Sequence, residues 1–251
     1  MTRDEILKLL QTVSHGEQTP EDALETLANL PSICMDYARL DTHRRLRRGI
    51  PETIYGQDKT PAQIEGIVEK FTESGSPVLV TRISPEAAEL VKGRWPEAET
   101  DEVSRTLNIG SLPAAGGPPI MVIAAGTSDL PVAEEAVKTA DFLGRNFVRA
   151  YDVGVSGLHR LAAFRDELEK AGVIIAVAGM EGALPSVVTG LVSVPVIGVP
   201  TSVGYGASLS GITPLLTMLS SCACGLTVVN IDNGYGAAVA AHMILGAGER
   251  L

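Results

Sequence analysis

The stretch VIIAVAGMEGALPSVVTGLVSVPVIGVP, residues 173–200, decides the fold class of this chain. Its apolar ends predict buried strands at 173–178 and 196–199, and the segment between them predicts a helix at 184–192. A strand, a glycine-containing turn, a helix and a second strand are typical of a parallel βαβ unit. The pattern repeats around it, with strands expected at 120–125, 147–151 and 226–231 and helices at 130–143, 158–170, 209–221 and 234–245. We therefore predict an α/β domain whose parallel sheet is covered by helices on both faces.

The N-terminal part of the chain lacks this regular alternation. It predicts helices at 4–14, 20–29 and 61–73, a strand at 78–82, a helix begun by Ser84 and Pro85, a strand at 104–109, and an irregular polar segment at 40–61. The stretch PAAGGPP at 113–119 indicates a linker. We expect an accessory region at 1–118, mostly helical with a small α/β unit and a basic arm, followed by a catalytic domain at 119–251.

Composition argues against several classes of function. The 251 residues are 45% apolar, enough for a large core, and the formal net charge of −10 argues against non-specific nucleic-acid binding. Three cysteines, an odd number, predict no disulfide framework and fit a reducing compartment. The charged start MTRDEILKLL has no signal-peptide pattern, and no apolar run is long enough to span a membrane. We expect a soluble, cytoplasmic protein that binds neither nucleic acid nor membrane.

Small residues follow every strand expected in the C-terminal part. Ligands of parallel sheets bind beyond the carboxyl ends of the strands, so these residues are candidates for ligand contact. Tight turns would explain glycine at any one strand end, but five such ends favour a phosphorylated ligand held by free N–H groups at helix starts. No G-x-G-x-x-G or P-loop sequence follows a strand, which argues against an ordinary dinucleotide fold or an ATPase. The expected binding residues are Gly126, Thr127, Ser156, Gly179, Met180, Gly182, Thr201, Asn233 and Gly234.

Several blocks of the chain resemble known families. GTSDLPVAEEA at 126–136, VAGMEGALPSVVTGLVSVPVIGVP at 177–200 and VVNIDNGYGAA at 228–238 resemble the PurE-type phosphoribosylaminoimidazole carboxylases. The whole chain more closely resembles the LarB family of nickel-pincer cofactor synthesis, through DTHRRLRRGIPETIYGQDKT at 41–60 and SSCACGLTVVNIDNGYG at 220–236. This resemblance implies a three-layer α/β/α, PurE/flavodoxin-like catalytic domain and a homo-octamer.

The resemblance also implies a reaction. The family carboxylates nicotinic acid adenine dinucleotide with CO2 or bicarbonate and cleaves its phosphoanhydride, giving pyridinium-3,5-biscarboxylic acid mononucleotide and AMP for the cofactor of lactate racemase-type enzymes. It implies that Ser128 and Asp129 contact substrate, whereas capping of the helix at 130–143 is the alternative role of Asp129. It implies no tightly bound cofactor. Mg2+ bound with the substrate pyrophosphate is an open option, and Asp129 is the candidate to hold it.

The chain departs from the PurE pattern at two loops. PurE relatives carry Ser-Ala-His-Arg after the second strand, where this chain has Asp152-Val153-Gly154-Val155, and His159 falls inside the following helix. Glu181 stands where the relatives have no carboxylate. Both departures argue against the purine reaction. An aminoimidazole ribonucleotide carboxylase or mutase, and a non-catalytic nucleotide-binding subunit, remain the alternatives.

The implied chemistry calls for a nucleophile and a base. A pyridinium ring repels electrophiles, so a nucleophile must add first and leave at the end, which a thiolate does best. Cys222 aligns with the family's nucleophilic cysteine, and Cys224 remains a second option; a zinc site at C-x-C lacks further ligands. Glu181 is the proposed base, because burial on its loop would make the carboxylate more basic. Its alternative role is to accept hydrogen bonds from nearby backbone N–H groups.

Arg44, Arg45, Arg47 and Arg48 form the densest basic run in this acidic chain. Arginine's planar guanidinium suits phosphate, so Arg45 and Arg48 are candidates to reach the pyrophosphate or AMP half of the substrate. A solvated face or a patch of salt bridges explains the run equally well. Lys59 is a weaker candidate of the same kind.

Overall fold

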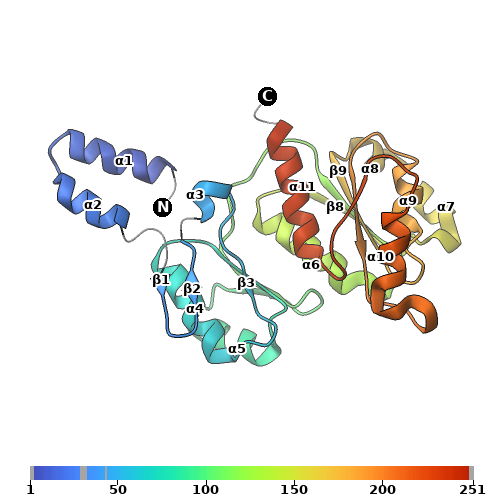
Figure 1. The fold of residues 1–251 in the computed structure, drawn as a ribbon, viewed down its shortest axis with the longest axis horizontal. Helices are drawn as coiled ribbons and strands as arrows, with labels where there is room; N and C mark the ends of the chain where they lie inside the picture. Colours follow the sequence, from blue (N-terminus) through green and yellow to red (C-terminus); the bar gives the residue numbers. More distant parts are fainter. Residues whose placement is uncertain (1–2, 29–32, 43, 249–251) are drawn as a thin grey trace. The chain divides into compact units, whose positions relative to one another are not determined.

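The structure, a computed structural model, describes residues 3–28, 33–42 and 44–248 (Figure 1). The chain divides into two compact units, Met1–Thr100 with Leu107–Gly110 and Asp101–Thr106 with Ser111–Leu251. The boundary expected after residue 118 stays a prediction.

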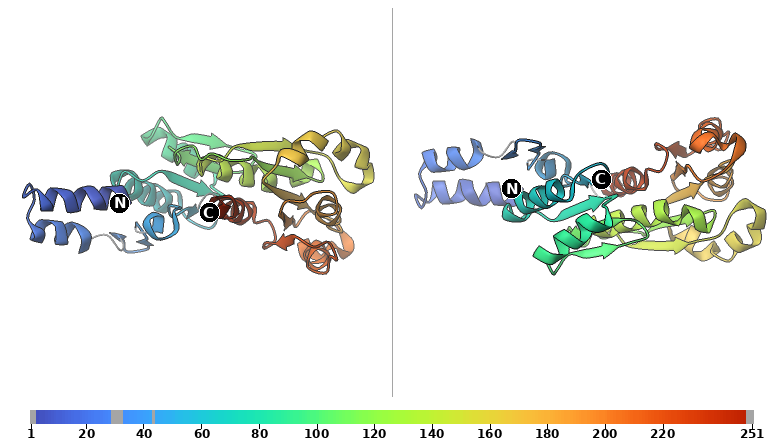
Figure 2. Two further views of the ribbon diagram at one scale, coloured as in Figure 1. Left: turned by 90° about the horizontal axis from the view of Figure 1, so that it is seen from above. Right: turned by 90° about the horizontal axis from the view of Figure 1, so that it is seen from below.

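The first unit begins with small elements. Helices α1 (Arg3–Ser14) and α2 (Pro20–Ala28) lie side by side (Figure 2). Strands β1 (Ile33–Cys34) and β2 (Arg39–Leu40) form an antiparallel pair, and the short helix α3 (Arg44–Arg48) follows. The basic run is therefore helical, which corrects the expectation that 40–61 is irregular.

A mixed sheet of four strands follows in the order β3-β4-β6-β5. Its strands are β3 (Ile54–Tyr55), β4 (Val78–Thr81), β5 (Glu99–Asp101) and β6 (Thr106–Ile109). Helix α4 (Pro61–Glu73) starts at a capping box in which Thr60 and Gln63 satisfy each other's backbone N–H groups, and α5 (Pro85–Arg94) starts at Ser84. Apolar residues of both helices, such as Ile64 and Val91, pack with the strands into one core.

The second unit is built on a parallel five-stranded sheet. Its strands are β7 (Ile120–Ala124), β8 (Phe147–Ala150), β9 (Val173–Ala178), β10 (Val196–Pro200) and β11 (Leu226–Val228). They lie in the order β8-β7-β9-β10-β11, and all four pairings are parallel. Counted along the chain this is the flavodoxin-like order 2-1-3-4-5, whose direction of winding reverses between β7 and β9.

Helices cover both faces of this sheet. Figure 1 shows α6 (Leu130–Phe142) beside α11 (Gly234–Gly248), and both pack on one face. Helices α7 (Leu158–Ala162), α8 (Arg165–Lys170), α9 (Leu184–Thr189) and α10 (Ile212–Leu219) pack on the other. Successive residues of β7 alternate between the two cores, with Val122 in the first and Ile123 in the second. The predicted three-layer α/β/α architecture is confirmed.

Two expected helices of this unit are interrupted. The helix predicted at 158–170 breaks at Ala163 and Phe164, where the Phe164 side chain turns to pack against the second core. The helix predicted at 209–221 begins as a 3-10 segment, Gly206–Gly211, because Leu209 and Ser210 adopt left-handed backbone conformations. Among the residues that the structure describes, no helix is long and apolar enough to cross a bilayer.

Candidate active site

A pocket of about 510 Å3 lies beyond the carboxyl ends of β7, β9 and β10 in the second unit. It sits at the point where the strand order reverses, which is where ligands bind in doubly wound sheets. Of the predicted site residues it brings together Gly126, Ser128, Asp129, Ser156, Gly179, Met180 and Glu181. The edge of the sheet predicted to bind ligand therefore contains a pocket.

Asp129 is the buried carboxyl of this pocket. The Thr201 hydroxyl donates a hydrogen bond to Asp129 Oδ1 at 2.7 Å, and the Gly126 N–H donates to Oδ2 at 3.0 Å. Burial raises the pKa of Asp129, although these hydrogen bonds oppose the rise. The carboxyl thereby links the loop after β7 to the loop after β10 across the floor of the pocket. Thr201 itself lies beneath the pocket, fully buried.

Gly179 lets two loops approach closely. A Cβ at this position would stand 2.3 Å from the Val203 carbonyl oxygen and 2.6 Å from Thr201 Oγ1. The next residue, Met180, donates its N–H to the same Val203 oxygen at 2.9 Å. The loop after β9 is thus fixed against the loop after β10, and both contribute to the pocket wall.

Strained backbone conformations gather at this edge. Left-handed φ values occur at non-glycine residues after β8, β9, β10 and β11, namely Asp152, Met180, Leu209, Ser210 and Asp232. Such conformations cost on the order of 1–3 kcal/mol each and cluster where loops are shaped for ligands. Asp232 Oδ1 accepts the N–H of Ser202 at 2.8 Å, so the last loop is tied to its neighbour.

Glu181 lines the pocket but is exposed. The expectation that its loop would bury the carboxylate is wrong for the single chain, because Glu181 follows the strand end by three residues and projects at the rim. The side chain nevertheless stands where a ligand in the pocket would meet it. Its role as a base stays a prediction.

Cys222 lies in the turn between α10 and β11. It follows α10 and precedes β11, whose first residue, Leu226, pairs with the first residue of β10, Val196. The residue before Cys222, Ser221, has its hydroxyl 2.8 Å from the hydroxyl of Ser186 in α9, two residues after the pocket-lining Leu184. Both Cys222 and Cys224 are exposed, so neither thiol fills a core. Neither lines the pocket of its own chain.

Other expected binding residues have structural contacts instead of a place in the pocket lining. Asn233 Oδ1 accepts the Gly236 N–H at 2.8 Å, which caps the start of α11. Gly234 packs against α6, where a Cβ would stand 2.2 Å from the Val132 carbonyl oxygen. Gly182 packs against Pro214, and Thr127 is exposed in the turn before α6. Their contact with substrate stays a prediction.

Arg45 and Arg48 belong to α3 in the first unit. Arg45 is half-buried and Arg48 is exposed. Their proposed reach to the phosphates of a substrate stays a prediction, as does that of Lys59, whose Nζ donates to the Tyr55 carbonyl at 2.7 Å.

The donor groups at the pocket are a poor match for a protein-held metal ion. Both oxygens of Asp129 already accept hydrogen bonds. In the described part of the chain, no three His, Cys, Asp or Glu side chains come together as a metal site would need. Mg2+ bound with a pyrophosphate stays a proposal, and no step below passes through it.

Sequence reasoning missed part of the site and a nearby polar cluster. The pocket is also lined by five residues that were not predicted, Gly154, Val155, Val203, Gly204 and Tyr205. Each of them follows an expected strand, and this position was the signal in the sequence that could have found them.

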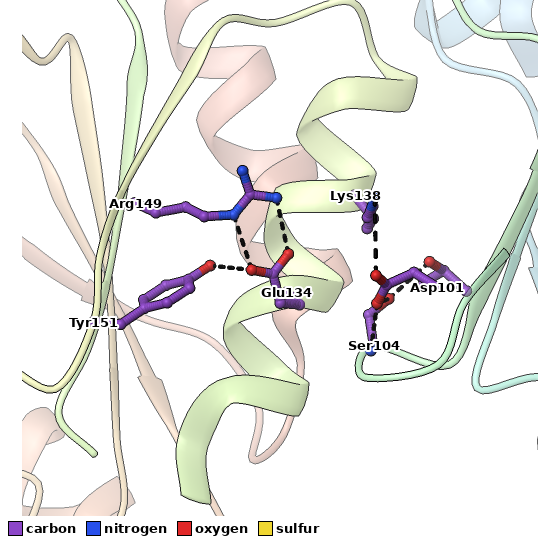
Figure 3. Close-up of polar contacts among 7 residues, drawn as sticks. Asp101, Ser104, Glu134, Lys138, Arg149 and Tyr151 are labelled. Atoms are coloured by element: carbon purple, nitrogen blue, oxygen red, sulfur yellow. Dashed lines mark hydrogen bonds and ion pairs between the residues drawn. The ribbon is translucent and has the colours of Figure 1, made fainter. Parts of the chain in front are cut away.

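The polar cluster ties a strand to a helix. Figure 3 shows Glu134 of α6 accepting hydrogen bonds from Arg149 Nε at 2.8 Å and from the Tyr151 hydroxyl at 2.6 Å. Burial, reinforced by Glu134, raises the pKa of Tyr151. This cluster anchors the end of β8 to α6.

A larger cavity of about 810 Å3 lies between α7, α8 and the segment 187–194. Its walls are mainly leucine and valine, with Arg165 and Glu169 as its charged residues. The segment 190–194 precedes β10, so this cavity does not belong to the carboxyl edge of the sheet. We therefore assign the candidate site to the smaller pocket, where polar groups converge.

Comparison with known proteins places the chain in a family. Residues 33–111 match the LarB/PurE-like N-terminal domain, and residues 119–251 match the AIR carboxylase domain. The chain belongs to the LarB family. An uncharacterized protein of Methanocaldococcus jannaschii is 43% identical to this LarB-family chain over 218 residues, covering 82% of this chain and 83% of the relative.

The PurE relatives match the second unit. An N5-carboxyaminoimidazole ribonucleotide mutase of Methanocaldococcus jannaschii is 36% identical over 130 residues, covering 50% of this chain and 78% of the relative. A crystal structure of a substituted PurE2 from Treponema denticola has a TM-score of 0.40 and 17% identity, covering 54% of this chain and 94% of that chain. The two matched domains indicate an enzyme of the PurE-related carboxylase and mutase class.

Proposed function

We propose that this protein carboxylates nicotinic acid adenine dinucleotide on its pyridinium ring and hydrolyses its phosphoanhydride. The products are pyridinium-3,5-biscarboxylic acid mononucleotide and AMP. One observation carries the proposal: in a LarB-family chain, the pocket at the switch point is lined by Glu181, a carboxylate that a ligand could reach. Net consumption is one CO2 and one water for each dinucleotide, so no oxidant, reductant or ATP is needed.

The helix start beside the pocket suits an anionic substrate. The segment Gly126–Asp129 precedes α6, a helix of 13 residues, and N–H groups at a helix start attract phosphate or carboxylate. Ser128 and Ser156 add exposed hydroxyls to the lining. Gly126 leaves the backbone at this helix start open to a ligand, because a Cβ there would meet only Asp129 Oδ2, at 3.7 Å.

The carboxylation proceeds through a sulfur adduct. A thiolate from Cys222 forms a C–S bond at the ring carbon opposite the nitrogen, and the displaced π electrons neutralise that nitrogen. The resulting dihydropyridine is an enamine, whose free carbon beside the sulfur-bearing carbon attacks CO2 and forms a C–C bond. Glu181 then takes the proton from this carbon. The nitrogen lone pair expels the thiolate, which restores the aromatic cation with two carboxylates.

The hydrolysis is a separate substitution at phosphorus. Water attacks one phosphorus of the pyrophosphate, the bond to the bridging oxygen breaks, and AMP leaves. Free N–H groups at the pocket would stabilise the charge that develops on the phosphoryl oxygens.

The test is incubation of the purified protein with nicotinic acid adenine dinucleotide and 14C-bicarbonate. We expect label in a mononucleotide and AMP in equal amounts. Cys34→Ser, which changes an exposed thiol in the first unit, is the matched control and should retain activity. Absence of both products from the wild-type protein, with and without Mg2+, would contradict the proposal.

The mutase relatives provide a second candidate function. Their match to the second unit favours an exchange of a carboxyl group on an aminoimidazole ribonucleotide. That ring is already electron-rich and needs no sulfur adduct, so Cys222→Ser would leave a mutase active. Turnover of an aminoimidazole ribonucleotide that survives Cys222→Ser would favour this second function.

A further inference from the structure

The first unit also has an edge at which parallel strands end. Strands β3 and β4 are parallel and their register aligns Tyr55 with Thr81, so their carboxyl ends lie at one edge of the sheet. The loops that follow are joined there, because the Gly56 N–H donates to the Thr81 carbonyl oxygen at 2.8 Å. A Cβ at Gly56 would stand 3.0 Å from that oxygen, so a glycine permits this approach. Ligands of parallel strands bind at such an edge.

Two cationic side chains meet at the Tyr55 ring. Lys59 Nζ lies 5.8 Å and Arg82 Cζ lies 5.7 Å from the ring centroid, within the range of a cation–π contact. Gln57 Oε1 accepts hydrogen bonds from the Tyr55 hydroxyl at 2.8 Å and from Arg82 Nη1 at 3.4 Å. We call Tyr55, Gln57, Lys59 and Arg82 the Tyr55 cluster. It gathers two positive charges and an aromatic ring from the loops after both strands.

The Tyr55 cluster is accessible to a ligand. Tyr55 is 48% exposed, and Lys59 and Arg82 are half-buried. Within the described part of the chain, Lys59 makes no ion pair with a carboxylate. Both loops contain a left-handed residue that is not glycine, Asp58 with φ +63° and Arg82 with φ +52°. Such conformations cost free energy and are concentrated where side chains are placed for ligands.

The chemistry of the cluster identifies the class of ligand. The planar guanidinium and the ammonium group are the two side-chain groups that pair best with phosphate, and an exposed aromatic ring can stack on a heterocyclic base. Helices α4 and α5 begin directly after the two loops, and their positive ends favour an anion there. Thr60 and Ser84 cap these helices, so the helices add a field and the side chains supply the donors. A nucleotide has both the phosphate and the base that this arrangement suits.

We propose that the Tyr55 cluster binds an adenosine phosphate group. Its phosphate pairs with Lys59 and Arg82, and its base stacks on the Tyr55 ring. The choice of adenosine rests on the function proposed above, in which AMP is one half of the substrate and later a free product. Both sources share this chemistry, and the kinetic measurement below separates them.

Calorimetric titration of the full chain tests the proposal. AMP should bind more tightly than adenosine or inorganic phosphate. Lys59→Gln and Arg82→Gln should each weaken AMP binding by about tenfold, because each removes a charge-assisted hydrogen bond. Lys92→Gln, which removes an exposed cation in the last turn of α5, is the matched control and should bind AMP as the wild type does. Circular dichroism checks that the variants fold. Equal AMP affinity of the wild type and both cluster variants would overturn the proposal.

The contribution of the ring is tested by a second pair of variants. Tyr55→Phe keeps the ring and loses only the hydrogen bond to Gln57, whereas Tyr55→Leu removes the ring. We expect Tyr55→Phe to keep the preference for AMP over inorganic phosphate and Tyr55→Leu to lose most of it. The same preference in both variants would contradict stacking of the base on Tyr55.

Photolabelling locates the site whether or not the proposed reaction is observed. Irradiation of the protein with 8-azido-AMP should label the tryptic peptide of residues 49–59, which contains Tyr55, and excess AMP should suppress that label. Label confined to peptides of the second unit would overturn the proposal.

Steady-state kinetics separate the two sources of the ligand. A raised KM for nicotinic acid adenine dinucleotide with unchanged kcat in Arg82→Gln would show that the cluster holds the AMP half of the substrate. Unchanged KM with weakened inhibition by AMP would show that it holds the free product. AMP binding and labelling at the cluster without any turnover would count against the proposed function alone. Turnover combined with no effect of the cluster variants on AMP binding or KM would overturn this inference alone.

Discussion

At the residue scale, Asp129 couples folding to pH. Burial raises the pKa of its carboxyl in the folded state above the unfolded value, so folding favours the protonated form. Its contribution to the free energy of unfolding is fully present below the unfolded pKa and is lost as pH rises through the folded pKa. Relative to Asp129→Asn, the wild-type protein should therefore gain stability as pH falls across this window. Denaturant unfolding of both proteins at several pH values measures the difference, and a constant difference would contradict the assignment.

Glu181 provides a second prediction at this scale. Removal of a general base typically costs about 10^2–10^4-fold in rate, so Glu181→Gln should lower carboxylation by that order. Glu169→Gln is the matched control, because Glu169 pairs with Arg165 on the surface of α8 at 3.1 Å and lies outside the pocket. Steady-state kinetics on both variants measure the effect. Equal rates for the two variants would remove Glu181 from the mechanism.

The sequence shows that glycines follow the strands, but it does not show what each of them does in the fold. Gly179 and Gly234 both follow strands and looked alike in sequence, yet one shapes the pocket and the other packs two helices. Only the three-dimensional neighbours distinguish the two uses. Thr201 was predicted to bind ligand, and this stays a prediction; in the structure its hydroxyl donates a hydrogen bond to Asp129.

At the element scale, α6 and α11 pack closely because small residues face each other. Ala133, Ala136 and Ala140 of α6 meet Ala237 and Ala241 of α11 in one buried core. Gly234→Ala should destabilise the protein by about 1–3 kcal/mol, since its Cβ would meet a backbone oxygen that cannot move freely. Gly248→Ala, in open space at the end of the same helix, should be neutral or stabilising. Thermal unfolding of the two variants compares them, and equal melting temperatures would contradict this packing argument.

The elements themselves were largely predictable. Strands β7 to β10 match the predicted ranges within one residue at each end, because apolar runs bounded by Gly, Pro and polar residues mark buried parallel strands clearly. β11 ends at Val228 instead of 231, because the chain leaves the sheet toward Asp232 and its left-handed turn. The break near Phe164 arises from tertiary packing, which a local pattern does not contain.

At the scale of the whole molecule, Cys222 lies outside the pocket lining of its own chain, in the turn between α10 and β11. The sequence predicted this turn, but it did not predict how near the turn comes to the pocket, because that depends on how α9 and α10 pack.

The central claim is that sulfur from Cys222 adds to the pyridinium ring. Its most direct test is near-ultraviolet absorption of the protein mixed with nicotinic acid adenine dinucleotide in buffer freed of CO2, where the adduct accumulates as a dihydropyridine. We predict a new absorption band with the wild-type protein and with Cys224→Ser, and no band with Cys222→Ser. A band that persists in Cys222→Ser, or its absence from the wild-type protein at saturating substrate, would contradict the account.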